Sequence, residues 1–500
     1  MAEIAAPAMH APASAPRTRA LVVTGPLWAG AGVLLVAPFF AAFRSGGYGF
    51  DSQVLIAVVL FTALALVAVA APWPPLPWGL PVAALGALTG YALWTGLSTG
   101  WARILDTASH DTYRVGMYCA AFALALAVMR VPSARRVTPD VLLAGILLVS
   151  LYSLAGRLLP GLAHERVTSA RLSQPLTYWN ALGLFAGFGV LLGIAIAGDI
   201  ARARAWRALA CAAAVPCGLV AFLTLSRGAA ASVAAGLVVL LVLRRGRATL
   251  LAAACALVPL LVLAVVLQAF PEVLSFHRGG SRQESQGAAF LPIAVAGTAV
   301  AGLALARFAR SGFWRAGPWL SPRARRRLAI AAVPTVLVAS VAVAGHGQEK
   351  TQVPSGAARL VQTQTNRGHY WRVALDAFRR HPLDGVGSGS FGAEWSRHRG
   401  RDDPALDAHS LYIETLAELG LVGAALLLGF IVAVAAGTVR AIRAAPRDPV
   451  LIAAAAVLGA FAAHAAIDWD WEMPAVSLIP LILAGAVLRT KRTDASARAG

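Results

Sequence analysis

Residues 20–43 read ALVVTGPLWAGAGVLLVAPFFAAF, an apolar run of 24 residues near the start of the 500-residue chain. A helix rises about 1.5 Å per residue and the hydrocarbon core of a bilayer is about 30 Å thick, so this run is long enough to cross a membrane. Similar runs recur along the chain, in which 58% of residues are hydrophobic and 13% are charged. The composition therefore predicts a polytopic membrane protein with an all-α fold, a bundle of transmembrane helices.

We expect about 12 to 14 transmembrane helices. The first run is longer than the core of a signal peptide and is followed by further runs, so we expect it to stay as an uncleaved helix. The weakest boundary is PWPPLPW at 72–78, and removing one hairpin there leaves twelve spans. The candidate spans cover residues 20–43, 54–72, 79–98, 113–129, 139–159, 180–198, 208–225, 229–243, 249–270, 288–306, 328–345, 412–437, 450–467 and 475–488.

The positive charge gathers on one side of this predicted topology. The side of the two termini holds 25 of the 43 Lys and Arg residues against five acids, whereas the other side holds 18 of each sign. The positive-inside rule then makes both termini cytoplasmic. Because the excess of +20 is a topology signal here, it does not favour nucleic acid as a partner.

The long polar stretch from His346 to Leu411 falls on the extracytoplasmic side, and we expect the chemistry there. This divides the chain into a cytoplasmic N-terminal tail (1–19), a transmembrane bundle (20–345), an extracytoplasmic catalytic loop (346–411), C-terminal transmembrane helices (412–488) and a cytoplasmic tail (489–500).

Three local patterns organise the loop. Apolar residues at helical spacing from Tyr370 to Phe378 predict an amphipathic helix of about three turns that ends at His381. Four glycines between 385 and 392 predict a flexible turn suited to close approach of the backbone to a ligand. Asp407 is a plausible N-cap, which would place His409 in the first turn of the next helix at the membrane surface.

One hairpin places an arginine below the membrane surface. Only 36 residues separate Arg207 from Arg244, yet two crossings need about 20 residues each. An ionisable residue at membrane depth usually faces a polar cavity or a partner, so Arg227 in this turn is a candidate site residue. The alternative is an arginine whose side chain extends to the interface.

The extracytoplasmic side thus offers several arginines and one histidine at a helix start. A guanidinium binds phosphate oxygens bidentately and stays charged, which suits a lipid diphosphate at the bilayer edge. A histidine there could act as general base towards an alcohol. The pattern predicts group transfer from a lipid diphosphate to a hydroxyl, with arginines stabilising the leaving diphosphate in place of a metal. The candidate residues are Arg171, Arg227, Arg367, Arg372 and His409.

A second constellation, HAAIDWDWEM, contains His464, Asp468, Asp470 and Glu472. Its ligand set is not specific for a metal, although a metal or acceptor site stays open. We expect it to anchor the membrane interface together with the two adjacent tryptophans.

Four motifs together resemble the O-antigen ligase and O-antigen polymerase superfamily of bacterial envelope glycosyltransferases. Three match in order, spacing and placement around a large outer loop, and a fourth is weaker. They are LSRGA (225–229), RGHYWRVALDAFRRHPLDGVGSGSF (367–391), AHSLYIETLAELGLVG (408–423) and the weaker RLSQPLTYWNALG (171–183).

The resemblance implies a GT-C-type bundle in the bacterial cytoplasmic (inner) membrane. Members transfer glycan from undecaprenyl diphosphate to a hydroxyl-bearing glycan, lipid or protein acceptor, without a required metal or cofactor. Carried over by motif, His409 is the catalytic base and Arg171, Arg227 and Arg367 bind the diphosphate. Supporting positions fall to Tyr412, Glu418 and Asn180. Ser410 departs from the Asn that many members have there, which leaves the acceptor type open.

Other protein classes remain open. A polysaccharide or lipid transporter or flippase is the main alternative, but it should show related halves and ionisable residues near the midplane of several spans. No such repeat is evident, and the polar motifs gather on the outer side. A peptidoglycan-polymerising enzyme should lack this motif order, and a non-catalytic scaffold would leave the arginines unexplained.

Overall fold

The computed structural model describes residues 17–71, 78–163, 171–244, 246–275, 281–311, 321, 323–324, 366–400 and 403–490. Helices are the regular elements throughout this described part of the chain, with no strand among them, so the predicted all-α fold is confirmed.

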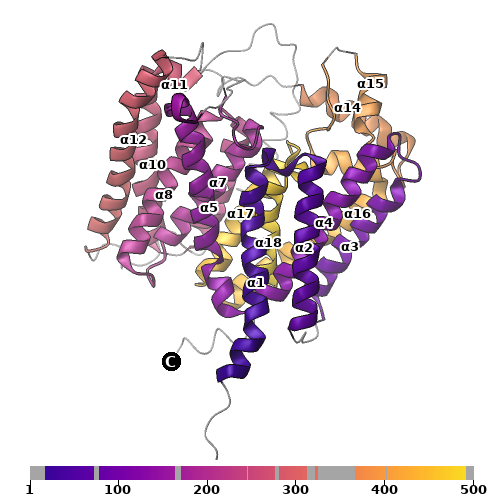
Figure 1. Ribbon diagram of the computed structural model, residues 1–500, viewed down its shortest axis with the longest axis horizontal. Coiled ribbons are helices and arrows are strands. Elements are labelled where there is room, and N and C mark those ends of the chain that lie inside the picture. Colours follow the sequence, from indigo (N-terminus) through magenta and orange to yellow (C-terminus); the bar gives the residue numbers. More distant parts are fainter. Residues whose placement is uncertain are drawn as a thin grey trace, which may run out of the picture.

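The long helices form one bundle (Figure 1). Nine of the described helices are long and apolar enough to cross a membrane, and α9, α17 and α18 are shorter apolar helices. The predicted span 328–345 and most of 72–78 lie outside the described residues. The bundle helices are α1 (Arg17–Ala42), α2 (Phe50–Ala70), α3 (Leu80–Ser98), α4 (Leu105–Val128), α5 (Pro132–Leu158), α7 (Trp179–Ala197), α8 (Arg204–Leu223), α9 (Arg227–Leu243), α10 (Arg247–Val266), α12 (Ser281–Phe308), α16 (Leu411–Ala444), α17 (Pro449–Ala465) and α18 (Pro474–Leu488).

Short helices connect or cover these: η1 (Ser45–Gly47), α6 (Pro160–Ala163), η2 (Leu267–Ala269), α11 (Pro271–Ser275), α14 (Arg367–Arg380), α15 (Phe391–His398) and η5 (Asp470–Glu472).

Small residues let the central helices approach closely. Helix α7 is buried over its whole length. A Cβ on its Gly193 would lie 2.7 Å from the carbonyl oxygen of Ala210 in α8, and a Cβ on Gly236 of α9 would lie 2.7 Å from that of Ala456 in α17. Close backbone approach at small residues is the usual basis of helix packing in membranes. The glycines therefore hold α7 close to α8 and α9 close to α17.

The two ends of the bundle differ. Helices α14 and α15 lie beyond the ends of α3, α4 and α16, whereas α1 begins at the opposite end (Figure 1). At that opposite end, Arg135 of α5 pairs with Asp448, the N-cap of α17, at 3.0 Å. Arg202 pairs with Asp199 at 3.2 Å in the turn between α7 and α8. We call the end of the bundle that α14 and α15 cover the α14–α15 end.

The glycine-rich turn at 385–392 exists as predicted but accommodates protein rather than a ligand. Gly385, Gly387 and Gly389 have φ of +71°, +90° and +64°, which a side chain would strain. A Cβ on Gly387 would lie 2.4 Å from Cα of Ala102, and one on Gly385 would lie 2.3 Å from the backbone of Glu418. The glycines therefore let the turn fit between the α3–α4 connection and α16.

Candidate active site

Three bundle helices begin at the α14–α15 end just after a residue in the left-handed conformation. Thr177 precedes α7 (φ +67°), Leu225 precedes α9 (φ +50°) and His409 precedes α16 (φ +57°). Among the described residues that are not glycine, Ser45 alone shares this conformation. Such residues cost of order 1–3 kcal/mol each and cluster at functional sites. The backbone strain therefore makes these three turns candidates for the functional site.

Arg171 connects the first two turns. Its Nε donates to the carbonyl oxygen of Thr224 at 2.7 Å, and its Nη2 donates to Oδ1 of Asn180 at 2.9 Å. Its guanidinium also lies 4.6 Å from the ring centroid of Trp179. The residue therefore has a fixed position between the start of α7 and the turn before α9.

Asp468 lies at the centre of the polar contacts. Its carboxylate, fully buried, accepts hydrogen bonds from Tyr178 Oη (2.7 Å), Asn180 Nδ2 (2.6 Å) and Arg367 Nη2 (2.6 Å). Burial acts to raise the pKa of Asp468, but the charge of Arg367 and the Tyr178 hydrogen bond lower it below its usual value. An ionised Asp468 thus connects Arg367 to Asn180 and, through Asn180, to Arg171. We call these five residues the Asp468 network.

Arg227 lies next to the same segment. It is the first residue of α9, half-buried, and the N-cap Ser226 accepts a hydrogen bond from the Ala229 amide at 3.2 Å. A Cβ on the neighbouring Gly228 would lie 3.0 Å from Cδ1 of Ile467. The turn that carries Arg227 therefore packs against the residues just before Asp468.

His409 has the geometry of a neutral base. Its Nδ1 lies 3.1 Å from the carbonyl oxygen of Asp407, which can only accept, so Nδ1 carries the hydrogen and Nε2 keeps its lone pair. The ring lies 5.3 Å from that of Tyr370 and 6.4 Å from that of Trp469. Burial lowers the pKa of His409 below its usual value. The imidazole is therefore neutral at neutral pH.

The start of α16 differs from the expectation. Asp407 is not the N-cap, and His409 is not in the first helical turn. The N-cap is Ser410, whose side chain accepts a hydrogen bond from the Ile413 amide at 3.4 Å. Ser410 is extended (φ −164°), so the helix starts one residue after it and His409 lies in the preceding turn.

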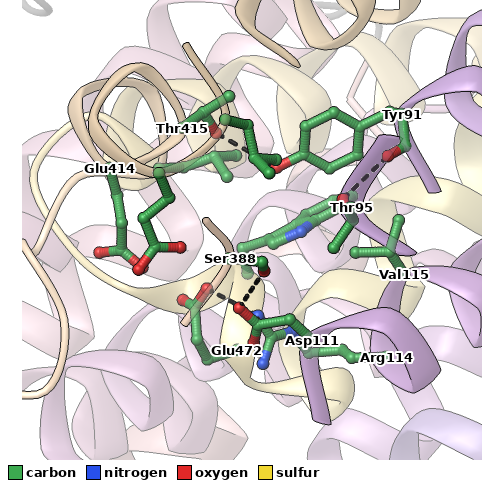
Figure 2. Close-up of a pocket in the computed structure, with 13 residues that line it drawn as sticks. Tyr91, Thr95, Asp111, Arg114, Val115, Ser388, Glu414, Thr415 and Glu472 are labelled. Atoms are coloured by element: carbon green, nitrogen blue, oxygen red, sulfur yellow. Dashed lines mark hydrogen bonds and ion pairs between the residues drawn. The ribbon is translucent and has the colours of Figure 1, made fainter. Parts of the chain in front are cut away.

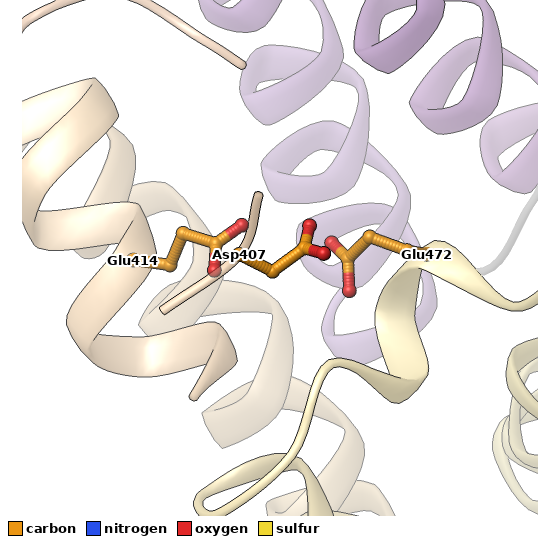
Figure 3. A group of neighbouring side chains, drawn as sticks. All are labelled: Asp407, Glu414 and Glu472. Atoms are coloured by element: carbon orange, nitrogen blue, oxygen red, sulfur yellow. The ribbon is translucent and has the colours of Figure 1, made fainter. Parts of the chain in front are cut away.

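Asp407 instead belongs to an acidic group. One carboxylate oxygen from each of Asp407, Glu414 and Glu472 lies within 4.8 Å of the other two. Figure 3 shows the three side chains. Burial raises the pKa of Asp407 to about 7. Carboxylate oxygens at this spacing could hold a hard cation, so the metal independence expected from the sequence stays a prediction.

A small polar cavity adjoins the acidic group, between α3, α4, α16 and η5 (Figure 2). Arg114 of α4 pairs there with Asp111 at 2.7 Å and with Glu472 at 3.3 Å. Ser388 of the glycine-rich turn donates its hydroxyl to Asp111 at 2.6 Å. The cavity therefore lies next to the glycine-rich turn, with Glu414 and Glu472 of the acidic group in its lining.

The two supporting residues of α16 contact the protein itself. Tyr412 donates its hydroxyl to the carbonyl oxygen of Ala462 at 2.9 Å, which connects α16 to α17. The buried carboxylate of Glu418 accepts from the amides of Gly389 (2.9 Å) and Phe391 (2.8 Å). Both residues therefore hold the structure around the site.

Arg372 lies away from the Asp468 network. It is exposed on α14. Because successive helical residues are about 100° apart, the five residues from Arg367 to Arg372 rotate its side chain to a different face. The structure thus brings Arg171, Asn180, Arg367 and His409 together around the Asp468 segment, with Arg227 beside it, and leaves Arg372 outside. Their chemical roles stay predictions.

Sequence reasoning missed the parts played by Tyr178 and Asp468. The tyrosine has the pattern of an interface aromatic, and Asp468 stood with His464 in a motif expected to anchor the interface. In the structure, His464 pairs through Nδ1 with Asp470, both fully buried. Asp468 pairs instead with Arg367, and Glu472 of the same motif pairs with Arg114. The available signal was an acid on the same predicted side as the arginine motifs.

Comparison with known proteins agrees with the motif resemblance. A family model described as O-Antigen ligase matches residues 287–428. The matched segment contains Arg367, Arg372 and His409 and ends before Asp468. A search of curated proteins found no match. The resemblance predicted from the motifs is thereby confirmed.

Replacing Asp468 by Asn tests the network. The change removes the charged partner of Arg367, whose side chain is 16% exposed. We therefore expect the free energy of unfolding to fall by about 3–5 kcal/mol. The control Tyr178→Phe removes one hydrogen bond to a charged group, worth about 1.5–3 kcal/mol. Thermal unfolding of the purified protein in detergent should therefore rank wild type above Tyr178→Phe and Tyr178→Phe above Asp468→Asn. An Asp468→Asn protein as stable as wild type would contradict the network.

Proposed function

We propose that this member of the O-antigen ligase superfamily transfers or polymerises an undecaprenyl-diphosphate-linked glycan onto a hydroxyl acceptor at the outer face of the bacterial cytoplasmic membrane. The observation that carries the proposal is the Asp468 network. Arg171 and Arg367 lie far apart in the sequence, yet one buried carboxylate beside His409 holds both: Arg367 bonds to Asp468 directly, and Arg171 bonds to Asn180, which bonds to Asp468. The α14–α15 end then faces outward, as the distribution of Lys and Arg favours.

The arginines provide the donor site. Arg367 bonds directly to Asp468, and Arg171 is held by Asn180 and the Thr224 carbonyl. Guanidinium groups already fixed in place lose little freedom when an anion binds, and they stabilise charge that develops on a leaving diphosphate. Arg227, at the N-terminus of α9, adds a third cation where a helix end also favours a negative charge. We assign the diphosphate to these three.

His409 performs the proton transfer. Its Nε2 takes the proton of the acceptor hydroxyl while that oxygen bonds to the anomeric carbon of the donor sugar. The bond from the anomeric carbon to the diphosphate breaks, and its electron pair leaves with the diphosphate. Direct displacement inverts the anomeric configuration. The proton then rests on His409, whose lowered pKa favours its release.

Ser410 keeps the catalytic turn in place although many family members have Asn there. Ser and Asn are both preferred N-caps, because each side chain accepts a hydrogen bond from the first helical turn. The Ser410 side chain does this for α16. The departure therefore preserves the helix start that follows His409.

Glycan transfer from a lipid-linked oligosaccharide in proteoliposomes tests the proposal. Loss of a general base lowers turnover by about 10²–10⁴-fold, so His409→Ala should fall in that range. Arg227→Ala should lose turnover as well, whereas Arg372→Ala should lose less because its side chain is exposed. Activity should be unchanged by a chelator, since arginines rather than a metal take the diphosphate charge.

The control is Arg440→Ala, an exposed residue near the end of α16 remote from His409. Full turnover by His409→Ala would remove the proposed base. Movement of the lipid-linked glycan across the bilayer without any turnover would instead identify a flippase.

The pH dependence of kcat gives an independent check. Protonated His409 cannot accept a proton, so activity falls as pH drops through its pKa. Because burial lowers that pKa from the usual value of 6.5, turnover should persist below pH 6.5 and decline only at lower pH. Asp468 acts to raise the pKa of His409, so Asp468→Asn should move the acid limb further down. An acid limb above pH 6.5 would contradict the assigned environment of His409.

A further inference from the structure

A second concentration of charge lies on α15. The carboxylate of Glu394, 1% exposed, is surrounded by cations from three segments. Arg103 Nε, from the α3–α4 connection, lies 3.3 Å away, and Arg380 at the end of α14 bonds to the other oxygen. On α15 itself, Arg397 lies at 4.0 Å and His398 Nδ1 at 3.5 Å. We call these five residues the Glu394 cluster.

The cluster carries more positive charge than it neutralises. Three arginines surround one carboxylate, so these four side chains together carry two positive charges. Oε1 of that carboxylate makes no hydrogen bond. The side chains of Arg103, Arg380 and Arg397 are 40%, 43% and 56% exposed. Each guanidinium has five N–H donors, more than its contact with Glu394 uses. The surface is therefore prepared for further anionic groups.

Two aromatic contacts connect the helix that carries the cluster to His409. Trp395 follows Glu394 on α15, and its ring lies 4.8 Å from that of Tyr370. Tyr370 in turn lies 5.3 Å from His409. The inner face of α15 thus packs towards the site while neighbouring residues of the same short helix carry the cluster. An acceptor glycan bound at His409 would therefore lie beside α14 and, through Tyr370, close to α15.

We propose that the Glu394 cluster binds carboxylate or phosphate groups of an acidic glycan acceptor. This inference rests on the proposed glycan transfer. The guanidinium fork matches both oxyanions, and an exposed cluster of this kind attracts an anionic chain as it approaches. Membrane headgroups are disfavoured because Arg380, Arg397 and His398 belong to the helices that lie beyond the bundle ends (Figure 1).

The alternative is a purely structural role, in which Glu394 stabilises the packing of α14, α15 and the α3–α4 connection. The two readings differ in what they predict for acceptors. A binding surface changes the KM for an acidic acceptor and leaves kcat, as well as any neutral acceptor, unaffected. If the role is structural, loss of the cluster lowers the stability of the protein and affects transfer to every acceptor alike.

The test uses the full-length double variant Arg103→Gln/Arg397→Gln, which keeps the Arg380–Glu394 pair. The matched control is Arg440→Gln/Arg443→Gln, which removes two exposed charges from the end of α16. Transfer is measured with an acidic acceptor glycan and with the same glycan after carboxyl reduction and dephosphorylation. Exposed ion pairs contribute about 0.5 kcal/mol each, so the loss of two should raise KM for the acidic acceptor about fivefold in the double variant alone.

Binding of dextran sulfate, with neutral dextran as reference, supplies a readout that needs no transfer. Weaker dextran sulfate binding by the double variant than by the control supports the cluster even if the wild type shows no turnover, in which case the proposed function fails alone. Equal KM changes for both acceptor forms, or equal dextran sulfate binding by the two variants, would overturn the proposal. So would selective loss of binding to phosphatidylglycerol vesicles with unchanged glycan binding.

Discussion

The arrangement of the site depends on one buried carboxylate. Asp468 has no exposed surface, and it holds a charge because Tyr178, Asn180 and Arg367 all donate to it. A buried charge is tolerated only when it is paired and hydrogen-bonded, and removing a partner is strongly destabilising. The cost of burying Asp468 therefore constrains the orientations of the residues around it. Those residues come from the start of α7, the start of α14 and the turn after α17.

The helix packing beneath the site supports the same arrangement. The glycines of α7 and α9 let these helices approach α8 and α17 closely, which brings the strained turns at Leu225 and Thr177 to the same end of the bundle. The glycine-rich turn at 385–392 places α15 between the α3–α4 connection and α16. Chain elements separated by hundreds of residues thus form one surface, on which a single carboxylate binds Arg367 directly, holds Arg171 through Asn180 and leaves positive charge for a bound anion.

The fold was largely predictable from the sequence, because hydrophobic span length follows directly from membrane thickness. The amphipathic helix at α14 was predictable for a similar local reason. The candidate site was predictable only in part: Arg171, Arg227, Arg367 and His409 stood out by residue type and motif. Asp468 and Tyr178 did not, since the contacts of Asp468 with Arg367 and Tyr178 span 101 and 290 residues and no local pattern encodes such contacts. The N-cap at Ser410 was missed because Asp407 is an equally good capping residue by type, and burial beside Glu414 and Glu472 decides otherwise.

In the proposed mechanism, the arginines bind the diphosphate while His409 acts only on the acceptor. The most direct test is the affinity of the purified protein for undecaprenyl diphosphate, with undecaprenyl monophosphate for comparison, in wild type, Arg367→Gln and His409→Ala. We expect Arg367→Gln to weaken diphosphate binding and to reduce the preference for the diphosphate over the monophosphate, whereas His409→Ala should bind the diphosphate as wild type does. Unchanged affinity in Arg367→Gln together with lost affinity in His409→Ala would contradict the proposed mechanism.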